Sequence, residues 1–384
     1  MASGTLPQEL ADHIIDLLSA IPTPTSDRND LVNCTLVSKA WLPRTSRRLL
    51  KHIEVLALKF PAFLRFAQSS ERFRAYTEEL VVLGTTDMSP HWTIMLSALP
   101  QLCSLELWSN LLPGNKFKPL PDSALARHHH LAKLKIHCAE LDAVPILLLP
   151  FDRVDTLELR SLIHYADDPS DWHSTTGGAA QVPNAIPLKV GRLILENCCK
   201  HNALSLLRTI LRPTAVFANG FDREEAASLS AFLQHAGQDV EHINLLPTQD
   251  DDASGGDARN WNSRGLVDLA VLAVCPKLTS ITLDLVDVFW AQDLCREVLR
   301  HMPKGISRLR IILTDDRWED ILGLIATHLR LSQDKYSELN SLELRGVCEE
   351  AESEEEVQAL LLEMREEVET SLPPRYSAIT KVLP

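Results

Sequence analysis

The reactive side chains of this sequence do not form the constellations that metal binding requires. Three consecutive histidines, His128 to His130, invite a metal interpretation. Adjacent residues on a helix point about 100° apart, however, and cannot converge on one ion, so a solvated helix end is the better interpretation. The run Asp250 to Asp252, with Asp257, lacks the alternate spacing and the distal Glu of a calcium loop. We therefore predict no metal site and no cofactor.

The cysteines do not indicate catalysis either. The vicinal pair Cys198 and Cys199 has no sequence neighbour that would clearly lower a thiol pKa. No C-x-x-C pair is present, and buried, reduced thiols are the expected state in a cytosolic or nuclear protein. The motifs G-x-S-x-G, G-x-G-x-x-G and H-E-x-x-H and a P-loop are also absent. We predict no catalytic residue, no small-molecule substrate and no enzymatic activity.

The chain is acidic, with a formal net charge of -14 at pH 7. Residues 349–369 carry ten Glu against one Arg, so the remainder is only mildly acidic. Such a chain is unsuited to nonspecific nucleic-acid binding, which needs Lys and Arg to neutralise phosphates. The longest apolar stretch, AVPILLLPF, is too short to span a membrane. We expect a soluble, cytoplasmic or nuclear protein that binds neither nucleic acid nor membrane.

A leucine-rich pattern recurs along most of the chain, which contains 65 leucines. The pattern is L-x-x-L-x-L with aliphatic substitutes, and its copies begin 23 to 50 residues apart, centred near the period of a leucine-rich repeat. Weaker copies begin at Leu50 and Thr77. The eight clear triplets are Leu102, Leu105 and Leu107; Leu131, Leu134 and Ile136; Val154, Leu157 and Leu159; Val190, Leu193 and Leu195; Val240, Ile243 and Leu245; Leu278, Ile281 and Leu283; Ile306, Leu309 and Ile311; and Leu339, Leu342 and Leu344.

Segments with helical periodicity lie between these strands, as in residues 223–236, 290–302 and 317–331. Short strands that alternate with helices predict parallel strands joined by right-handed crossovers. The units would stack as a solenoid in which each buries its apolar side against its neighbours. An ordinary α/β domain with leucine-rich strands is the alternative. Two polar segments, residues 166–187 and 247–265, read as loops inserted into the stack.

The acidic tail contains one further predicted helix. Ser353 and Glu356 fit a capping box at its start. Its apolar stripe, suited to covering the exposed end of the last repeat, consists of Val357, Leu360, Leu361, Met364 and Val368.

If the solenoid binds a substrate, the polar positions beside the buried triplets line its inner surface. For three successive strands, the predicted columns are Glu106, Lys135 and Glu158, and then Trp108, His137 and Arg160. Further such positions are Glu196, Asp284, Arg310, Glu343 and Arg345. Charged pairs in such columns stabilise a sheet by themselves, so a structural role and a binding role both stay open. The mixed charge favours a protein partner over nucleic acid or lipid.

The first fifty residues have helical periodicity in place of the repeat. A T-x-x-Q capping box at Thr5, with Pro7 in the first turn, predicts a helix start. One face of this helix consists of Leu10, Ile14, Leu17 and Leu18. Residues 19–29 interrupt the helix, and a third helix begins in LPRTSRRLL. The three helices form a unit of about 45 residues, near the lower limit for independent folding.

The middle helix of this unit, LVNCTLVSKAW at residues 31–41, is apolar nearly all round. Its two predicted stripes are Leu31, Cys34, Val37 and Trp41, and Val32, Leu36 and Ala40. So small a unit cannot readily bury both stripes, and leaving one in water would forgo roughly 1.5 to 3 kcal/mol per side chain. We therefore expect another protein to cover one stripe; the alternative is that Trp41 fills the junction with the first repeat.

These residues resemble the F-box motif: LPQEL, then Ile14 and Ile15, then Asp30, Leu31 and Cys34, then LVS and Trp41, in the expected order. The resemblance covers about residues 6–55, and the connector at residues 19–29 is longer than is usual in the family. The resemblance implies docking onto a Skp-type adaptor and, through it, a cullin-RING ubiquitin ligase. The adaptor-binding residues that it implies are Leu6, Pro7, Ile14, Leu31, Val37 and Trp41.

F-box proteins often carry leucine-rich repeats that bind the substrate, and this chain resembles that pairing. The expected fold is α/β, a small N-terminal three-helix F-box followed by a curved right-handed leucine-rich-repeat-like solenoid of alternating short parallel strands and helices. The expected domains are residues 1–50, 51–348 and 349–384, the last an acidic capping helix and tail. The expected function is that of a non-catalytic substrate adaptor in an SCF-type ligase. A repeat scaffold for protein–protein interaction, without a ligase role, is the alternative.

Overall fold

A computed structural model of the chain describes residues 7–20, 26–84, 92–108, 129–137, 144–162, 187–198, 204, 207–221, 225–247, 269–286, 288, 290–314, 318–347 and 353–383. Contacts divide the chain into two compact units, Met1–Asp152 and Arg153–Pro384. Twelve parallel strands form the sheet, in the same order as in the sequence. The predicted α/β class, with parallel strands and interleaved helices, is therefore confirmed.

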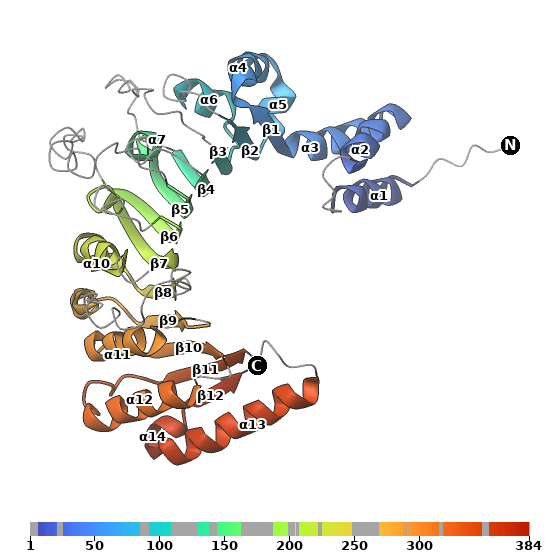
Figure 1. Cartoon of the computed structure of the whole chain (residues 1–384). Helices are drawn as coiled ribbons and strands as arrows, with labels where there is room; N and C mark the ends of the chain where they lie inside the picture. Colours follow the sequence, from blue (N-terminus) through green and yellow to red (C-terminus); the bar gives the residue numbers. More distant parts are fainter. Residues whose placement is uncertain are drawn as a thin grey trace, which may run out of the picture. The chain divides into compact units, whose positions relative to one another are not determined.

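The first unit begins with three helices and continues with short strands (Figure 1). Its elements are α1 (Gln8–Ala20), α2 (Ser26–Val37), α3 (Leu42–Lys51), β1 (His52–Leu56), the 3-10 helix η1 (Ala57–Lys59), α4 (Phe60–Ser69), α5 (Glu71–Tyr76), β2 (Glu79–Leu83), α6 (Trp92–Ala98), β3 (Ser104–Trp108), β4 (His129–His137) and α7 (Val144–Leu148). Strands β1 to β4 pair in parallel, each with the next.

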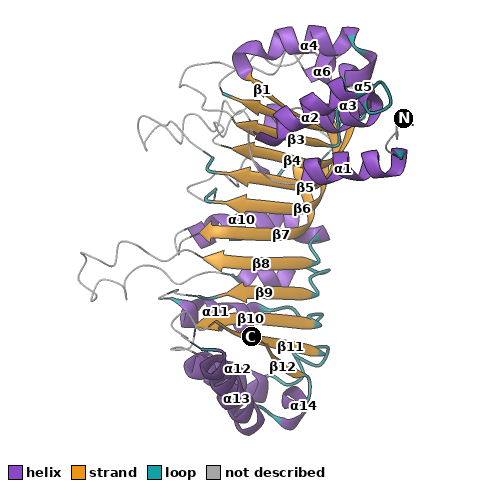
Figure 2. Ribbon diagram, turned by 90° about the vertical axis from the view of Figure 1, so that its right-hand side faces the viewer, coloured by secondary structure: helices purple, strands orange, loops and turns teal. Residues whose placement is uncertain are grey.

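The second unit repeats the alternation of strand and helix, with strands drawn as parallel arrows in Figure 2. Its elements are β5 (Phe151–Arg160), β6 (Leu188–Glu196), β7 (Leu211–Phe221), α10 (Glu225–Ala236), η6 (Gly237–Asp239), β8 (His242–Pro247), η9 (Ala270–Val274), β9 (Ser280–Asp284), α11 (Ala291–His301), β10 (Arg308–Thr314), α12 (Trp318–Leu331), β11 (Ser341–Val347), α13 (Glu354–Ser371), α14 (Pro374–Ser377) and β12 (Thr380–Leu383). The helices predicted at residues 223–236, 290–302 and 317–331 are α10, α11 and α12.

All eight predicted triplets are buried. On β4, for example, Leu134 and Ile136 have no exposed surface, whereas Lys135 between them is partly exposed. This alternation follows from strand geometry, which points successive side chains to opposite faces. One face of the sheet is therefore the core, and the other, which we call the open face, carries the polar positions between the leucines.

Two strands were not predicted. β7 lies inside the 50-residue spacing between the triplets of β6 and β8, and its register places Pro213, Val216 and Ala218 opposite Val190, Leu193 and Leu195. Proline and alanine at two of its three core positions hid the pattern. β12 follows α13 and pairs with β11. The acidic helix α13 is thus a crossover between two strands, and the sheet continues beyond residue 348.

The start of α13 agrees with the predicted capping box, because the Ser353 side chain accepts a hydrogen bond from the backbone N–H of Glu356 at 3.3 Å. Leu361, Met364 and Val368 of the predicted stripe are buried. The histidine run differs from the prediction, since His129 and His130 are the first residues of β4 and not a helix end. The predicted loops at residues 166–187 and 247–265 lie outside the described residues, apart from Pro187 and Pro247.

The helical boundaries in the first unit also differ from the prediction. α2 begins at Ser26 and ends at Val37, and a turn closed by the hydrogen bond from Trp41 N–H to the Ser38 carbonyl separates it from α3. Trp41 is therefore the N-cap residue of α3, one position before Leu42 and two before Pro43. Proline in a first helical turn is a strong start signal, and it divides the stretch at residues 31–41 between two elements.

Strands β5, β6 and β7 share a backbone feature near their ends. Ser161 and Asn197, each directly after its strand, and Gly220, the next-to-last residue of β7, have φ angles of 49°, 53° and 69°. The first two donate their N–H groups to the carbonyls of Glu196 and Asn219 on the next strand, at 2.9 and 3.0 Å. Beside them the buried Cys198 thiol donates to the Leu159 carbonyl at 2.9 Å, and burial raises the pKa of this thiol to about 12. Cys198 is thus a packing residue, as predicted; Cys199 lies outside the described residues.

The close approach of β6 to β5 gives a test of this packing. A Cβ atom on Gly191 would lie 2.6 Å from the backbone oxygen of Asp155, so Gly191→Ala must displace a strand and is expected to cost about 1 to 3 kcal/mol. A matched change, Gly323→Ala on α12, meets no atom within 4 Å and should stabilise by about 0.5 to 1 kcal/mol. Urea unfolding followed by circular dichroism measures both, and equal effects of the same sign would contradict the packing.

Candidate protein-binding surfaces

The three N-terminal helices surround a small core. Helices α1 and α2 pack together, and Ala11 and Ile15 of α1 and Leu31 and Cys34 of α2 are all buried. On α3, the buried positions are the polar Thr45 and Ser46. The predicted apolar face of α1 is not the buried one, because its members Leu10 and Leu17 are exposed. Among the side chains of these helices that the structure describes, one isoleucine and one leucine are the largest buried ones, which is a small core for three helices.

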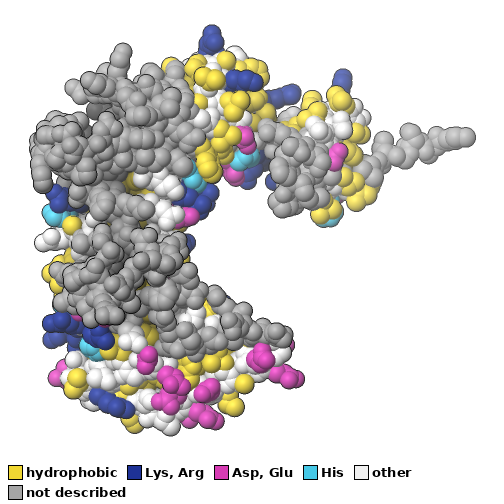
Figure 3. All heavy atoms as spheres, in the orientation of Figure 1, with side chains coloured by type: hydrophobic (Ala, Val, Ile, Leu, Met, Phe, Trp, Pro, Cys, Tyr) yellow, Lys and Arg dark blue, Asp and Glu magenta, His cyan; other side chains and the backbone are white. Residues whose placement is uncertain are grey.

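Large aliphatic side chains instead lie on the outside of α1 and α2. Of the two predicted stripes of the middle helix, the one containing Val32 and Leu36 is exposed, with Leu36 81% accessible. Figure 3 shows apolar side chains over the surface of these helices. We call this surface the aliphatic surface, defined by Leu10, Leu17, Val32, Leu36 and Val37. Solvation of such groups is unfavourable, and large apolar side chains exposed on neighbouring helices make this surface a candidate interaction site.

The six predicted adaptor-binding residues differ in how exposed they are. Pro7 and Val37 are exposed, Ile14 and Trp41 are partly buried, and Leu31 is only 7% exposed. Leu6 lies outside the described residues. Leu31 thus packs inside the helical unit, and the surface beside it is formed by its neighbours Val32 and Leu36.

Ion pairs hold α3 against α1. The Asp16 carboxylate accepts hydrogen bonds from the Arg44 guanidinium at 3.1 Å and the Arg48 guanidinium at 2.8 Å. The hydrogen bond from Arg44 is the main cause, with help from Arg48, that lowers the pKa of Asp16 to about 2 in spite of its partial burial. Arg44 also reaches Asp12 at 3.2 Å.

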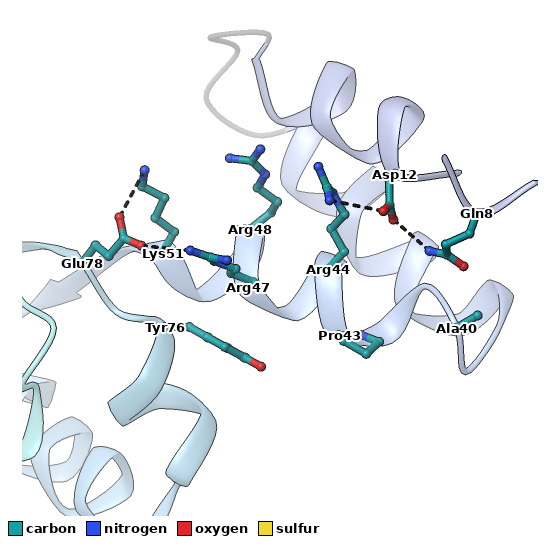
Figure 4. A pocket seen from close by; sticks show the side chains of 10 residues that line it. All are labelled: Gln8, Asp12, Ala40, Pro43, Arg44, Arg47, Arg48, Lys51, Tyr76 and Glu78. Atoms are coloured by element: carbon teal, nitrogen blue, oxygen red, sulfur yellow. Dashed lines mark hydrogen bonds and ion pairs between the residues drawn. The ribbon is translucent and has the colours of Figure 1, made fainter. Parts of the chain in front are cut away.

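A groove of about 560 Å³ lies between α1, α3 and the segment that follows α5 (Figure 4). Its basic side chains all come from one face of α3: Arg44, Arg47, Arg48 and Lys51. Their charges are largely matched by acidic groups, since Lys51 pairs with Glu78 at 3.3 Å and Arg44 with Asp12. Sequence reasoning did not single out this groove, although basic residues at helical spacing in RTSRRLLK were visible.

On the open face of the first unit, the Glu106 carboxylate has three nitrogen atoms close to it. The indole N–H of Trp108 donates to its Oε1 at 2.7 Å, Lys135 Nζ lies 3.3 Å from Oε2, and His137 Nε2 lies 3.3 Å from Oε1. The predicted lateral neighbours Glu106 and Lys135, and Trp108 and His137, are directly opposite in the register of β3 and β4. Burial favours the protonated form of Glu106, but the Trp108 hydrogen bond and the Lys135 charge outweigh it and lower the pKa of Glu106.

Trp108 is held rigidly in this cluster. Its ring stacks on the His137 ring with centroids 4.1 Å apart and planes 3° from parallel. His137 is buried, whereas Trp108 remains 43% exposed. A large aromatic ring that is fixed on one face and open on the other provides contact area at little entropic cost.

The second unit carries further open-face pairs. Arg160 Nε lies 2.9 Å from Glu196 Oε2 and also contacts Glu158, which is buried. Arg310 pairs with Glu343 at 3.0 Å on adjacent strands. The remaining two predicted positions, Asp284 and Arg345, lie on β9 and β11; burial raises the pKa of Asp284, and the Arg345 charge opposes the rise.

The part of the chain that the structure describes contains no group of three or more His, Cys, Asp or Glu side chains that could hold a metal ion. The predicted acidic loop at Asp250 to Asp252 and Asp257 lies outside that part. Among the same residues, no helix is both long and apolar enough to cross a membrane.

A comparison with protein-family models found no match for this chain, and a search of curated proteins also found none.

The Asp16 ion pairs predict a pH dependence. The carboxyl pKa in the folded chain is about 2, below its ordinary value of 3.8, so its stabilising contribution is complete above about pH 4 and is lost as the pH falls towards 2. Asp16→Asn should therefore lower stability at neutral pH, and the difference from the wild type should shrink over that range. Hydrogen exchange of the α1 and α3 backbone amides measures this difference in stability locally.

Asp12→Asn is the control, because Asp12 pairs with one arginine, Arg44, and also accepts a hydrogen bond from the neutral amide of Gln8, so its charge should matter less than that of Asp16. A wild-type advantage over Asp16→Asn that persists undiminished at about pH 2 would contradict the assignment.

Proposed function

We propose that this chain is the substrate-recognition adaptor of an SCF-type ubiquitin ligase. In this proposal α1 to α3 form an F-box-like domain that binds a Skp-type adaptor. The strands and helices that follow form a curved, right-handed leucine-rich-repeat-like solenoid that binds a protein substrate. The observation that carries the proposal is the aliphatic surface, five large side chains exposed on α1 and α2, while few large side chains are buried among the described residues of these helices.

The order of the motif is a second support for this proposal. The segments that resemble the F-box motif fall on or beside three consecutive helices, and Leu36 and Val37 of the LVS element are the last two residues of α2. An adaptor that covered the five aliphatic side chains would remove them from water. Each fully buried side chain would contribute roughly 1.5 to 3 kcal/mol before the costs of association.

The proposed mechanism is proximity. An adaptor that holds a substrate lysine near a charged ubiquitin carrier makes the transfer effectively intramolecular. The chain then needs two separate binding surfaces and no catalytic side chain. Its place of action would be the cytoplasm or the nucleus, where cullin-RING ligases work.

One observation favours a second candidate, a repeat scaffold whose N-terminal helices only cap the first strand. α3 runs directly into β1, and Lys51 at its end pairs with Glu78 next to β2. The helices are therefore continuous with the sheet of their unit. In this candidate the aliphatic surface would contact other partners or none.

Binding to a purified Skp-type adaptor, measured by calorimetry, separates the two candidates. Leu36→Asp should weaken adaptor binding at least tenfold, because it places a charge in the centre of an apolar contact. Leu331→Asp is the matched control. Leu331 lies at the end of α12 and is 81% exposed, as is Leu36, so both changes should leave the circular dichroism spectrum unchanged.

Failure of the wild-type chain to bind the adaptor would reject the ligase proposal and favour the scaffold. Equal binding by the wild type and Leu36→Asp would reject the aliphatic surface as the adaptor site.

A further inference from the structure

Three apolar side chains lie in a row on the open face of the first unit. Burial of the leucines on the opposite face of the sheet does not account for them. Leu56 at the end of β1 is opposite Leu83 at the end of β2, and Leu83 is opposite Trp108 at the end of β3. We call these three residues the apolar row. Leu56 is 54% exposed, Leu83 is partly exposed and Trp108 is open on one side. Open-face positions of a solvated sheet are usually polar, so the row is an exception that calls for a partner.

Trp108, at the end of the row, is already fixed in a position where a partner can contact it. Trp108 is fixed by the hydrogen bond to Glu106 and by the stacked, buried ring of His137. A partner that covers the exposed side of Trp108 therefore has little side-chain freedom left to remove. Tryptophan in a fixed position is also the residue type that most often dominates the energy of a protein interface.

The neighbouring row gives the charge that a partner must complement. One pleat away lie Glu54, Val81 and Glu106, in register across the same three strands, and Lys135 follows on β4. Glu54 is exposed, and Glu106 is held in its charged form by its donors. The Glu106 charge is already paired with Lys135, so a segment lying over the apolar row would have the exposed Glu54 carboxylate on its flank, where a Lys or Arg would fit.

The spacing selects the conformation of the partner. Side chains in the row repeat at the distance between neighbouring strands, about 4.8 Å. One turn of an α-helix advances about 5.4 Å, so residues at i, i+3 or i+4, and i+7 drift from the row by only about 1.2 Å over two steps. Same-side residues of an extended segment repeat at about 6.7 Å and would drift by about 4 Å.

We infer that the apolar row is the docking site for an amphipathic, basic α-helix of a protein partner. The helix lies along the row, with aliphatic or aromatic residues at i, i+3 or i+4, and i+7 on Leu56, Leu83 and Trp108. A Lys or Arg residue on its flank faces the exposed Glu54 carboxylate. This inference rests on the proposed role of the open face in substrate binding and specifies the class of segment bound.

The test is selection of a displayed library of helical peptides, with randomised surface positions, on the full-length chain. Enriched peptides should show apolar residues at the helical spacing and a positive net charge. Their binding, measured with fluorescently labelled synthetic peptides, should weaken about tenfold or more with Leu56→Glu and with Trp108→Ala.

Leu58→Glu is the matched control, because Leu58 is exposed, lies two residues from Leu56 and belongs to η1 and not to the row. This change should alter peptide binding less than about twofold. Circular dichroism of each variant shows whether the fold is retained, and the two separate changes in the row guard against one variant that fails to fold.

Three results would overturn the inference: no enrichment on the wild-type chain, enrichment of peptides with the alternating pattern of a strand, or binding as sensitive to Leu58→Glu as to Leu56→Glu. None of these results involves the aliphatic surface on α1 and α2. Adaptor binding by the same Leu56→Glu protein therefore shows whether the ligase proposal survives a failure of the apolar row.

Discussion

The rest of this structure depends on one interaction, the burial of the aliphatic side chains that each strand places on the core face of the sheet. Leu134 and Ile136 are removed from water on one face, and the alternation of side chains then forces Lys135 to the other. A slip of one residue in register would expose the leucines and bury the charges, so the register is strongly specified. The same constraint aligns equivalent open-face positions of successive strands, which is why Glu106 meets Lys135 and Trp108 meets His137.

The N-terminal helices cannot use this interaction, because they contain no strand. Few of their described residues are buried, and ion pairs from Asp16 to Arg44 and Arg48 join α3 to α1. Partly exposed ion pairs fix geometry but contribute little stability, typically less than about 1 kcal/mol each. The three helices therefore keep a defined arrangement while leaving Leu36 and its neighbours in water. An interface that removes them from water would supply the apolar burial that the unit itself lacks.

Strands whose core positions fit the leucine pattern could be predicted from the sequence, and strands that depart from it could not. All eight triplets were found because their core positions are aliphatic, whereas β7 was missed because Pro213 and Ala218 occupy two of its three core positions. In the first unit, residues 31–41 read as one helix, and the turn before Pro43 divides them. Which stripe of α2 is buried could not be predicted, because it depends on where α1 and α3 pack. Sequence spacing alone does not contain that information.

On the open face, the pairs between strands were predictable from register, but the contact between Trp108 and Glu106 on one strand was not. That contact decides what the surface can offer a partner. Glu106 already accepts a hydrogen bond from Trp108 and pairs with Lys135 within the chain, so a partner gains little by replacing either of them. The exposed ring of Trp108, with Leu56 and Leu83 beside it, can still gain by burial. The apolar row would therefore supply affinity, and the charges beside it would set the orientation of whatever binds there.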